Sequence, residues 1–265
     1  MPARPTELWR TLREHLPEYL IEAFCLGTFM VSAGLVTTLL EAPASPFHGA
    51  LGSAAMRRAI SGLAMGLTAM ALIYSPWGRR SGAHMNPAIT LSFLRLGRIA
   101  RIDAAAYVAM QFVGGIVGVL LVRWLAGPAF AAPPVSWIET QPGIPGPLVA
   151  FAAEALISAL MMWTVLRLAS SASLARYTGL AAGTLVALYI AVEAPLSGMS
   201  INPARSLASA APAGDWHALW IYFTAPLLGM LAATELRLRG ARVQPCAKLI
   251  HASTQRCIHC GQSPA

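Results

Sequence analysis

Long stretches without a charged side chain dominate this sequence and limit what it can fold into. Five of them cover residues 23–40, 59–78, 104–122, 177–192 and 216–234, and a sixth, 147–168, contains only Glu154 and Arg167 as charged residues. A helix needs about 20 mostly apolar residues to cross a bilayer. None of the stretches alternates with the period of two that a membrane β-barrel requires. The sequence therefore predicts an all-α membrane protein with six transmembrane helices.

The composition excludes several other classes of protein. Only 11% of the residues are charged and 56% are hydrophobic, whereas soluble domains carry roughly 25% charged residues. The apolar content excludes a disordered chain, and 4 cysteines in 265 residues are too few for a disulfide scaffold. The net charge of +8 does not indicate a nucleic-acid partner, because the basic residues lie between the apolar stretches. Residues 1–18 are polar, which argues against a cleavable signal peptide.

The basic residues predict the orientation in the membrane. With the N-terminus in the cytoplasm, 15 of the 19 Lys and Arg residues fall on the cytoplasmic side, as the positive-inside rule favours. They are Arg4, Arg10, Arg13, Arg79, Arg80, Arg95, Arg98, Arg101, Arg167, Arg176, Arg237, Arg239, Arg242, Lys248 and Arg256. Arg57, Arg58 and Arg123 fall on the other side. We expect a multi-pass protein of the inner (plasma) membrane with both termini in the cytoplasm.

A short motif occurs twice along the chain. Residues 81–88 read SGAHMNPA and residues 197–204 read SGMSINPA. Each follows the second span of a three-span half, and because three is odd, the second half enters the membrane in the opposite orientation. This predicts an inverted repeat, as in many transport proteins, with halves at about 19–124 and 147–236. The channel domain would cover 19–242, between a cytoplasmic N-terminal segment, 1–18, and a tail, 243–265.

Each Asn-Pro-Ala is expected to begin a helix, because Asn is a good N-cap and Pro is favoured in the first turn. The neutral stretches that follow, 87–94 and 206–214, are too short to cross a bilayer. We therefore expect two re-entrant half-helices that enter from opposite faces. Their positive dipole ends would meet near the midplane, with the side-chain amides of Asn86 and Asn202 facing one lumen as donors.

With these features the chain resembles the major intrinsic protein family, the aquaporins and aquaglyceroporins, over about residues 19–236. The resemblance also rests on Glu22-Ala23-Phe24 and Gly27-Thr28-Phe29 in the first span, on Gln111, Gly114 and Gly118 in the third, and on Arg205 directly after the second Asn-Pro-Ala. It implies a homotetramer in a lipid bilayer in which every subunit has its own pore. It also implies that the protein is not an enzyme and that its channel domain needs no cofactor.

The resemblance assigns residues to the pore. The pore motifs are Asn86, Pro87, Ala88, Asn202, Pro203 and Ala204. Simple helix capping is the alternative role for the two asparagines. The selectivity filter is expected to consist of Met65, Ile190, Met199 and Arg205. For Arg205 the alternative is a structural salt bridge.

Two residues of the second span are alternatives for the remaining filter position. The local match at Gly66-Leu67-Thr68 selects Met65, whereas counting back from Asn86 selects Gly66. We favour Met65, because loops absorb insertions more readily than helices.

Two carboxylates and a histidine are expected to hold the motif loops. The resemblance implies that Glu22 and Glu154, early in the first and fourth spans, accept backbone N–H groups from the loops. The alternative is a proton relay, which would make the protein an ion-coupled carrier. We expect His84 to be a hydrogen-bonded loop residue, with a pH-dependent gate as the alternative. Glu193, near the end of the fifth span, is expected either to shape the outer vestibule or to be solvated.

The solute is predicted from family patterns. Ser206 and Ala210 stand where glycerol-type members have Asp and a basic residue, and Tyr222-Phe223 replaces their Pro-Leu pair. Ile190 stands where water-selective members have His and glycerol-conducting members have aromatic residues. We predict a passive channel for water that excludes ions and protons. The alternative is a channel of the same fold for small neutral solutes such as glycerol, urea or hydrogen peroxide, and the remote alternative is the ion-coupled carrier.

The tail contains a set of metal-ligating residues outside the resemblance: Cys246, His251, Cys257 and Cys260. Three thiols and an imidazole, with a Cys-x2-Cys pair, suit a tetrahedral zinc site, and His259 could replace one ligand. A reducing cytoplasm disfavours a disulfide. Zinc binding by the tail is therefore a hypothesis, and a disordered basic tail with free thiols is the alternative.

Overall fold

The computed structural model describes residues 5–240, 246–251 and 256–262. Within these ranges all helices and turns of regular secondary structure are α or 3-10, and there is no β-strand. Six of the described helices are long and apolar enough to cross a membrane. They are α2 (Leu16–Glu41), α4 (Ala54–Tyr74), α7 (Arg101–Ala126), α9 (Pro147–Ala169), α10 (Thr178–Val192, preceded by the 3-10 turn η2, Ala175–Tyr177) and α13 (Leu219–Leu238). The prediction of an all-α protein with six spans is confirmed.

Caps and prolines, rather than charges, set the ends of the second span. The Oγ of Ser53 accepts a hydrogen bond from the N–H of Met56, so α4 begins at Ala54 and includes Arg57 and Arg58. The stretch 59–78, expected to be one span, is divided at Ser75. The Ser75 side chain accepts the N–H of Gly78 and starts a separate short helix, α5 (Pro76–Ser81).

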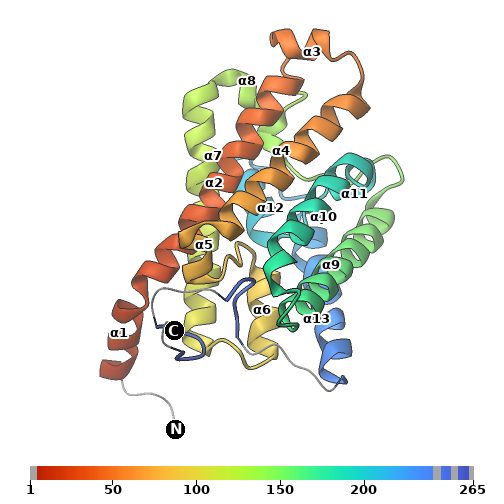
Figure 1. The fold of residues 1–265 in the computed structure, drawn as a ribbon. Helices are drawn as coiled ribbons and strands as arrows, with labels where there is room; N and C mark the ends of the chain where they lie inside the picture. Colours follow the sequence, from red (N-terminus) through yellow and green to blue (C-terminus); the bar gives the residue numbers. More distant parts are fainter. Residues whose placement is uncertain (1–4, 241–245, 252–255, 263–265) are drawn as a thin grey trace.

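Two half-helices lie between the spans. They are α6 (Pro87–Arg95) and α12 (Pro203–Ala213), and each begins at the proline of its Asn-Pro-Ala motif, as expected. The Oδ1 of Asn86 accepts the N–H of Ala88, and the Oδ1 of Asn202 accepts the N–H of Ala204. In Figure 1, α6 lies in the lower half of the bundle and α12 in the upper half. The half-helices therefore occupy opposite sides of the bundle.

Glycines allow the long helices to approach closely. A Cβ placed on Gly118 of α7 would lie 2.5 Å from the carbonyl oxygen of Gly27 in α2. A Cβ on Gly66 of α4 would lie 2.5 Å from the carbonyl oxygen of Gly183 in α10. Small residues at such crossings let two helix backbones touch. No larger side chain fits at these positions without moving a backbone.

The remaining helices mark the two ends of the bundle. These are α1 (Pro5–Glu14), α3 (Pro46–Ala50), α8 (Pro128–Ala131), the 3-10 turn η1 (Ser136–Ile138) and α11 (Ala194–Ser197). We call the end with α1 and the described tail residues the tail face, and the end with α3 and α8 the far face (Figure 1). Cys246, Ala247, Leu249 and Cys257 of the tail are buried. A disordered tail is therefore wrong for the described residues, which pack onto the bundle.

Candidate functional site

A cavity of about 330 Å³ passes between the long helices. Its lining reaches from Glu41 and Arg58 at the far face to Ile73 and Leu249 at the tail face. Asn86 and Asn202 line its middle. The cavity therefore leads along the bundle past both half-helix N-termini.

The loops that precede the two half-helices have matching backbone conformations. Six of their residues have φ between 50° and 110°: Gly82, Ala83, Met85, Gly198, Met199 and Ile201. Residues other than glycine rarely adopt this conformation, which costs of order 1–3 kcal/mol each. The surrounding structure must therefore hold both loops in place.

The buried carboxylate of Glu22 holds the first loop. Its Oε1 accepts hydrogen bonds from the Ser81 hydroxyl at 2.7 Å and from the His84 N–H at 3.0 Å. Its Oε2 accepts the Met85 N–H at 2.7 Å and the side-chain amide of Gln111 at 2.8 Å. Glu22 does not line the cavity, so its carboxylate binds groups of the protein rather than a molecule in the cavity.

Glu154 holds the second loop in the same way. Its Oε1 accepts the Ser197 hydroxyl at 2.8 Å and the Ser200 N–H at 2.6 Å, and its Oε2 accepts the Ile201 N–H at 2.7 Å. Glu154 is also absent from the cavity lining. A proton relay requires carboxylates that are exposed to the pathway, and neither carboxylate has this exposure.

The two asparagines connect the loops to each other. The Nδ2 of Asn86 donates to the carbonyl oxygen of Ile201 at 2.7 Å, and the Nδ2 of Asn202 donates to the carbonyl oxygen of Met85 at 2.7 Å. The paired Asn-Pro-Ala motifs predict that these amides face a lumen as donors. In the structure each uses one donor to fasten the opposite loop while the residue lines the cavity.

The four expected filter residues, Met65, Ile190, Met199 and Arg205, all line the cavity. Of the two alternatives in the second span, Met65 lies on the cavity, and Gly66 faces the α10 backbone. The Nη1 of Arg205 is buried without a hydrogen-bond partner among the described residues. No ion pair between described residues involves Arg205, so the salt-bridge alternative has no support there.

His84 joins the first loop to the tail. Its Nδ1 lies 3.0 Å from the Thr90 hydroxyl, and its Nε2 lies 2.8 Å from the carbonyl oxygen of Ala247. Its ring stacks on Phe93 with centroids 4.8 Å apart. The sequence offered no signal for the contact with Ala247, because 163 residues separate the partners.

Glu193 is buried rather than solvated, with 7% of its surface exposed. Burial raises the pKa of its carboxyl from 4.5 to about 7. It lies between α10 and α11, and it is not among the residues that line the cavity.

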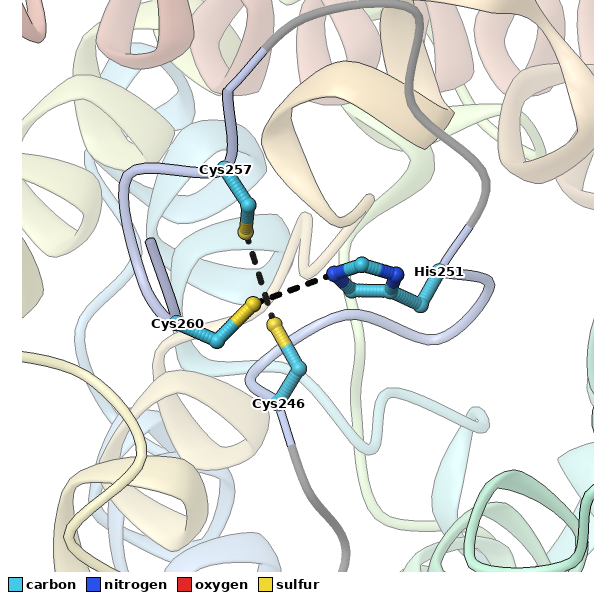
Figure 2. Close-up of side chains that lie close together, drawn as sticks. All are labelled: Cys246, His251, Cys257 and Cys260. Atoms are coloured by element: carbon cyan, nitrogen blue, oxygen red, sulfur yellow. Dashed lines mark hydrogen bonds between the residues drawn. The ribbon is translucent and has the colours of Figure 1, made fainter. Parts of the chain in front are cut away.

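The four expected metal ligands of the tail converge (Figure 2). The ligand atoms of Cys246, His251, Cys257 and Cys260 all lie within 4.8 Å of one another. His259, the expected substitute ligand, points elsewhere, because its Nε2 lies 3.3 Å from the carbonyl oxygen of Ser81.

Comparisons with known proteins agree with this architecture. A profile of the Major intrinsic protein family matches residues 9–236. Aquaporin NIP1-1 of Arabidopsis thaliana is 36% identical over 171 residues, which cover 63% of this chain and 57% of that protein. Aquaporin NIP3-1 of Zea mays is 30% identical over 250 residues, covering 94% of this chain and 74% of that protein. The chain thus matches less than two thirds of the length of its Arabidopsis NIP1-1 relative.

A solved structure has the same fold. The aquaglyceroporin from Plasmodium falciparum aligns with a TM-score of 0.65, covering 84% of this chain and 95% of that one. The two sequences are 18% identical, so this likeness concerns the fold alone.

Proposed function

Because this chain belongs to the major intrinsic protein family, we propose that it is a passive transmembrane channel that conducts water. The observation that carries the proposal is the cavity that leads from the far face to the tail face past Asn86 and Asn202. A channel of this kind needs no catalytic residue, and the protein is accordingly not an enzyme.

The residues along the cavity suit water. A side-chain amide has two N–H donors, so each asparagine retains one for a passing oxygen atom after it has fastened the opposite loop. Arg205 offers further donors in the filter, while Met65, Ile190 and Met199 supply apolar walls. The positive ends of α6 and α12 and the charge of Arg205 oppose cations and protons.

The second candidate is a channel of the same fold for small neutral solutes. It is favoured by the filter, in which three of four side chains are apolar and two are methionines. Methionine is flexible and adapts its shape, so the filter can widen for glycerol, urea or hydrogen peroxide. An ion-coupled carrier is disfavoured, because Glu22 and Glu154 are enclosed by the loops that they hold.

Stopped-flow light scattering on proteoliposomes tests these proposals. An osmotic step with sucrose should shrink proteoliposomes faster than empty liposomes, and shrinkage at the empty-liposome rate both with and without a metal chelator would refute water conduction. With glycerol or urea as the osmolyte, rapid re-swelling would favour the second candidate. A rate that depends on an imposed proton gradient would favour a carrier.

We further propose that the tail face lies in the cytoplasm. Arg10 and Arg13 belong to α1 at this face, and the start of α7, with Arg98 and Arg101, is joined to the end of α1 by the contact between His15 and Asp103. The positive-inside rule favours that side for basic residues. A reporter protein that works only in the cytoplasm should be active when it is fused to the C-terminus. A reporter that works only outside the cytoplasm should be inactive at the same position. The resemblance also suggests a homotetramer, which the mass of the detergent-solubilised protein, corrected for detergent, would confirm or refute.

A further inference from the structure

The tail cluster has the size of a zinc site. A tetrahedral zinc ion with bonds of about 2.3 Å to sulfur and 2.0–2.1 Å to nitrogen holds two sulfurs about 3.8 Å apart. The Sγ atoms of Cys246 and Cys257 lie 3.5 Å apart, and the Nε2 of His251 lies 3.2 Å from the Sγ of Cys260. All four ligand atoms lie within 4.8 Å of one another. Because no two of these atoms are more than 4.8 Å apart, adjustments of about 1 Å or less would complete a tetrahedron.

The backbone presents these ligands without help from helices or strands. Cys257 and Cys260 lie in a tight turn, in which the Gly261 N–H donates to the carbonyl oxygen of Cys257 at 2.9 Å with Gly261 at φ 73°. Cys246 and His251 come from the other described segment of the tail, 246–251. A metal ion would therefore join two segments that lack regular secondary structure. In small metal-binding modules, the free energy of metal binding stabilises the folded state.

The charges around the cluster fit a metal with three thiolates. Zn²⁺ with three thiolates and a neutral imidazole carries a net charge of −1. Lys248, in the same tail segment as Cys246 and His251, is 2% exposed. A zinc centre with this net charge is compatible with the buried cationic side chain of Lys248 in the same tail segment.

The same tail segment covers one end of the cavity. The Leu249 N–H donates to the carbonyl oxygen of Gly82 at 3.2 Å, and His84 contacts the carbonyl oxygen of Ala247. A Cβ on Gly82 would lie 2.8 Å from that Ala247 oxygen, so the two backbones are in direct contact. Leu249 is 2% exposed and lines the cavity.

We propose that Cys246, His251, Cys257 and Cys260 bind one Zn²⁺ ion, and that the zinc-bound tail closes the tail-face mouth of the cavity with Leu249. The metal site stands on the cluster alone, whereas the closing role rests on the proposed channel function. Loss of the metal frees the two tail segments from each other, so Leu249 leaves the mouth and permeability rises.

The metal site is tested on the full-length protein in detergent, incubated with Zn²⁺ under reducing conditions and then desalted. We expect about one zinc per chain, because the site has the ligand set of a structural zinc centre. Cys257→Ala and His251→Ala should each lower the affinity for Zn²⁺. The loss should exceed the roughly 10–100-fold that follows when a residue that only hydrogen-bonds to a metal ligand is replaced. The matched controls Cys25→Ala, in α2, and His217→Ala should retain the metal. Cobalt-loaded protein should show the visible absorption of tetrahedral thiolate ligation.

Wild-type protein that retains almost no zinc, or controls that lose as much as the ligand variants, would refute the metal site. A disulfide between Cys246 and Cys257 that persists under the reducing conditions would also refute it. Because cobalt absorption is measured on wild-type protein, the test does not depend on whether a ligand variant folds.

The closing role is tested by osmotic shrinkage of proteoliposomes. Zinc-loaded wild type should conduct water several-fold more slowly than the same sample after chelation. Leu249→Ala should conduct as fast as chelated wild type while retaining its zinc, whereas the control Leu228→Ala, on the exposed surface of α13, should behave as wild type. Equal rates for loaded and chelated wild type would refute the closing role.

The two proposals fail in distinguishable ways. If the zinc content behaves as expected but neither chelated wild type nor Leu249→Ala exceeds empty liposomes with any osmolyte, the channel function fails and the metal site stands. If both conduct at the same high rate as zinc-loaded wild type, the channel function stands and the closing role fails.

Discussion

The side-chain amide of Asn202 donates a 2.7 Å hydrogen bond to the carbonyl oxygen of Met85, and Asn86 makes the reciprocal bond to Ile201 at the same distance. Each half of the repeat therefore fastens the loop of the other. Both loops have backbone conformations that are unfavourable for L-residues. They are held from outside by Glu22 and Glu154 and at their tips by each other.

Asn202→Asp should separate the two loops. Aspartate keeps the oxygen that caps α12 but replaces the donor to Met85 with a second oxygen, which repels the carbonyl. Loss of this buried hydrogen bond should destabilise the protein by about 1–3 kcal/mol and reduce water permeability. Thermal unfolding in detergent and stopped-flow shrinkage measure the two effects. Since Asn86 and Asn202 are the only asparagines in the sequence, selective ¹⁵N-asparagine labelling reports on the pair alone; unchanged amide signals of Asn86 would contradict the coupling.

Glu154→Gln should lower the melting temperature more than Glu235→Gln. Glu154 accepts three hydrogen bonds from the second loop, and a glutamine NH₂ group would face one of those donors. We expect a loss of about 3 kcal/mol. Glu235 pairs with Arg95 and has a side chain that is 46% exposed, so its loss should cost below about 1 kcal/mol. Equal melting temperatures for the two variants would contradict the role of Glu154 as a loop brace.

Gly118→Ala should destabilise the crossing of α2 and α7. The added methyl group would lie 2.5 Å from the carbonyl oxygen of Gly27, and overpacking typically costs about 1–3 kcal/mol. Gly49→Ala is the matched control, because nothing lies within 4 Å of a Cβ at that position of α3. Thermal unfolding should show a lower melting temperature for the first variant only. A decrease for Gly49→Ala of the same size would remove the steric explanation.

Met199→Ala should widen the filter. Met199 lines the cavity beside Arg205, and removal of its thioether leaves a gap in one apolar wall. Glycerol entry into proteoliposomes should increase relative to water permeability. Met56→Ala, on the exposed surface of α4, serves as the control. If glycerol entry is unchanged while the variant still conducts water, Met199 is not part of the constriction.

Glu193→Gln should stabilise the protein at alkaline pH and not at acidic pH. Burial raises the pKa of Glu193 from 4.5 to about 7, so between these values the unfolded chain loses the proton and the folded chain retains it. Stability is therefore lost as the pH rises through this window and changes little beyond it. We expect the melting temperature of Glu193→Gln to exceed that of wild type at pH 8 and to equal it at pH 4. Glu14→Gln, with a side chain that is 63% exposed in wild type, should show no such difference, and a constant offset for Glu193→Gln at both pH values would contradict the assigned pKa.

The six spans, the two half-helices and the inversion of the repeat follow from local sequence patterns. The reason is that a bilayer imposes a minimum length of apolar helix and that Asn-Pro is a strong local signal for a helix start. These properties depend on neighbouring residues, so they can be read along the chain. The predicted positions of the helix ends were less accurate. At Ser75, for example, a side-chain cap divides a neutral stretch that was expected to form one helix.

The three-dimensional fold is needed for every feature that depends on residues far apart in the chain. It placed Met65 rather than Gly66 on the cavity, because Gly66 is taken up by the close crossing with Gly183. It turned the Asn86 amide towards Ile201, and it seated Leu249 of the tail against Gly82. No local pattern encodes such contacts, since each depends on how two separately folded segments meet in space.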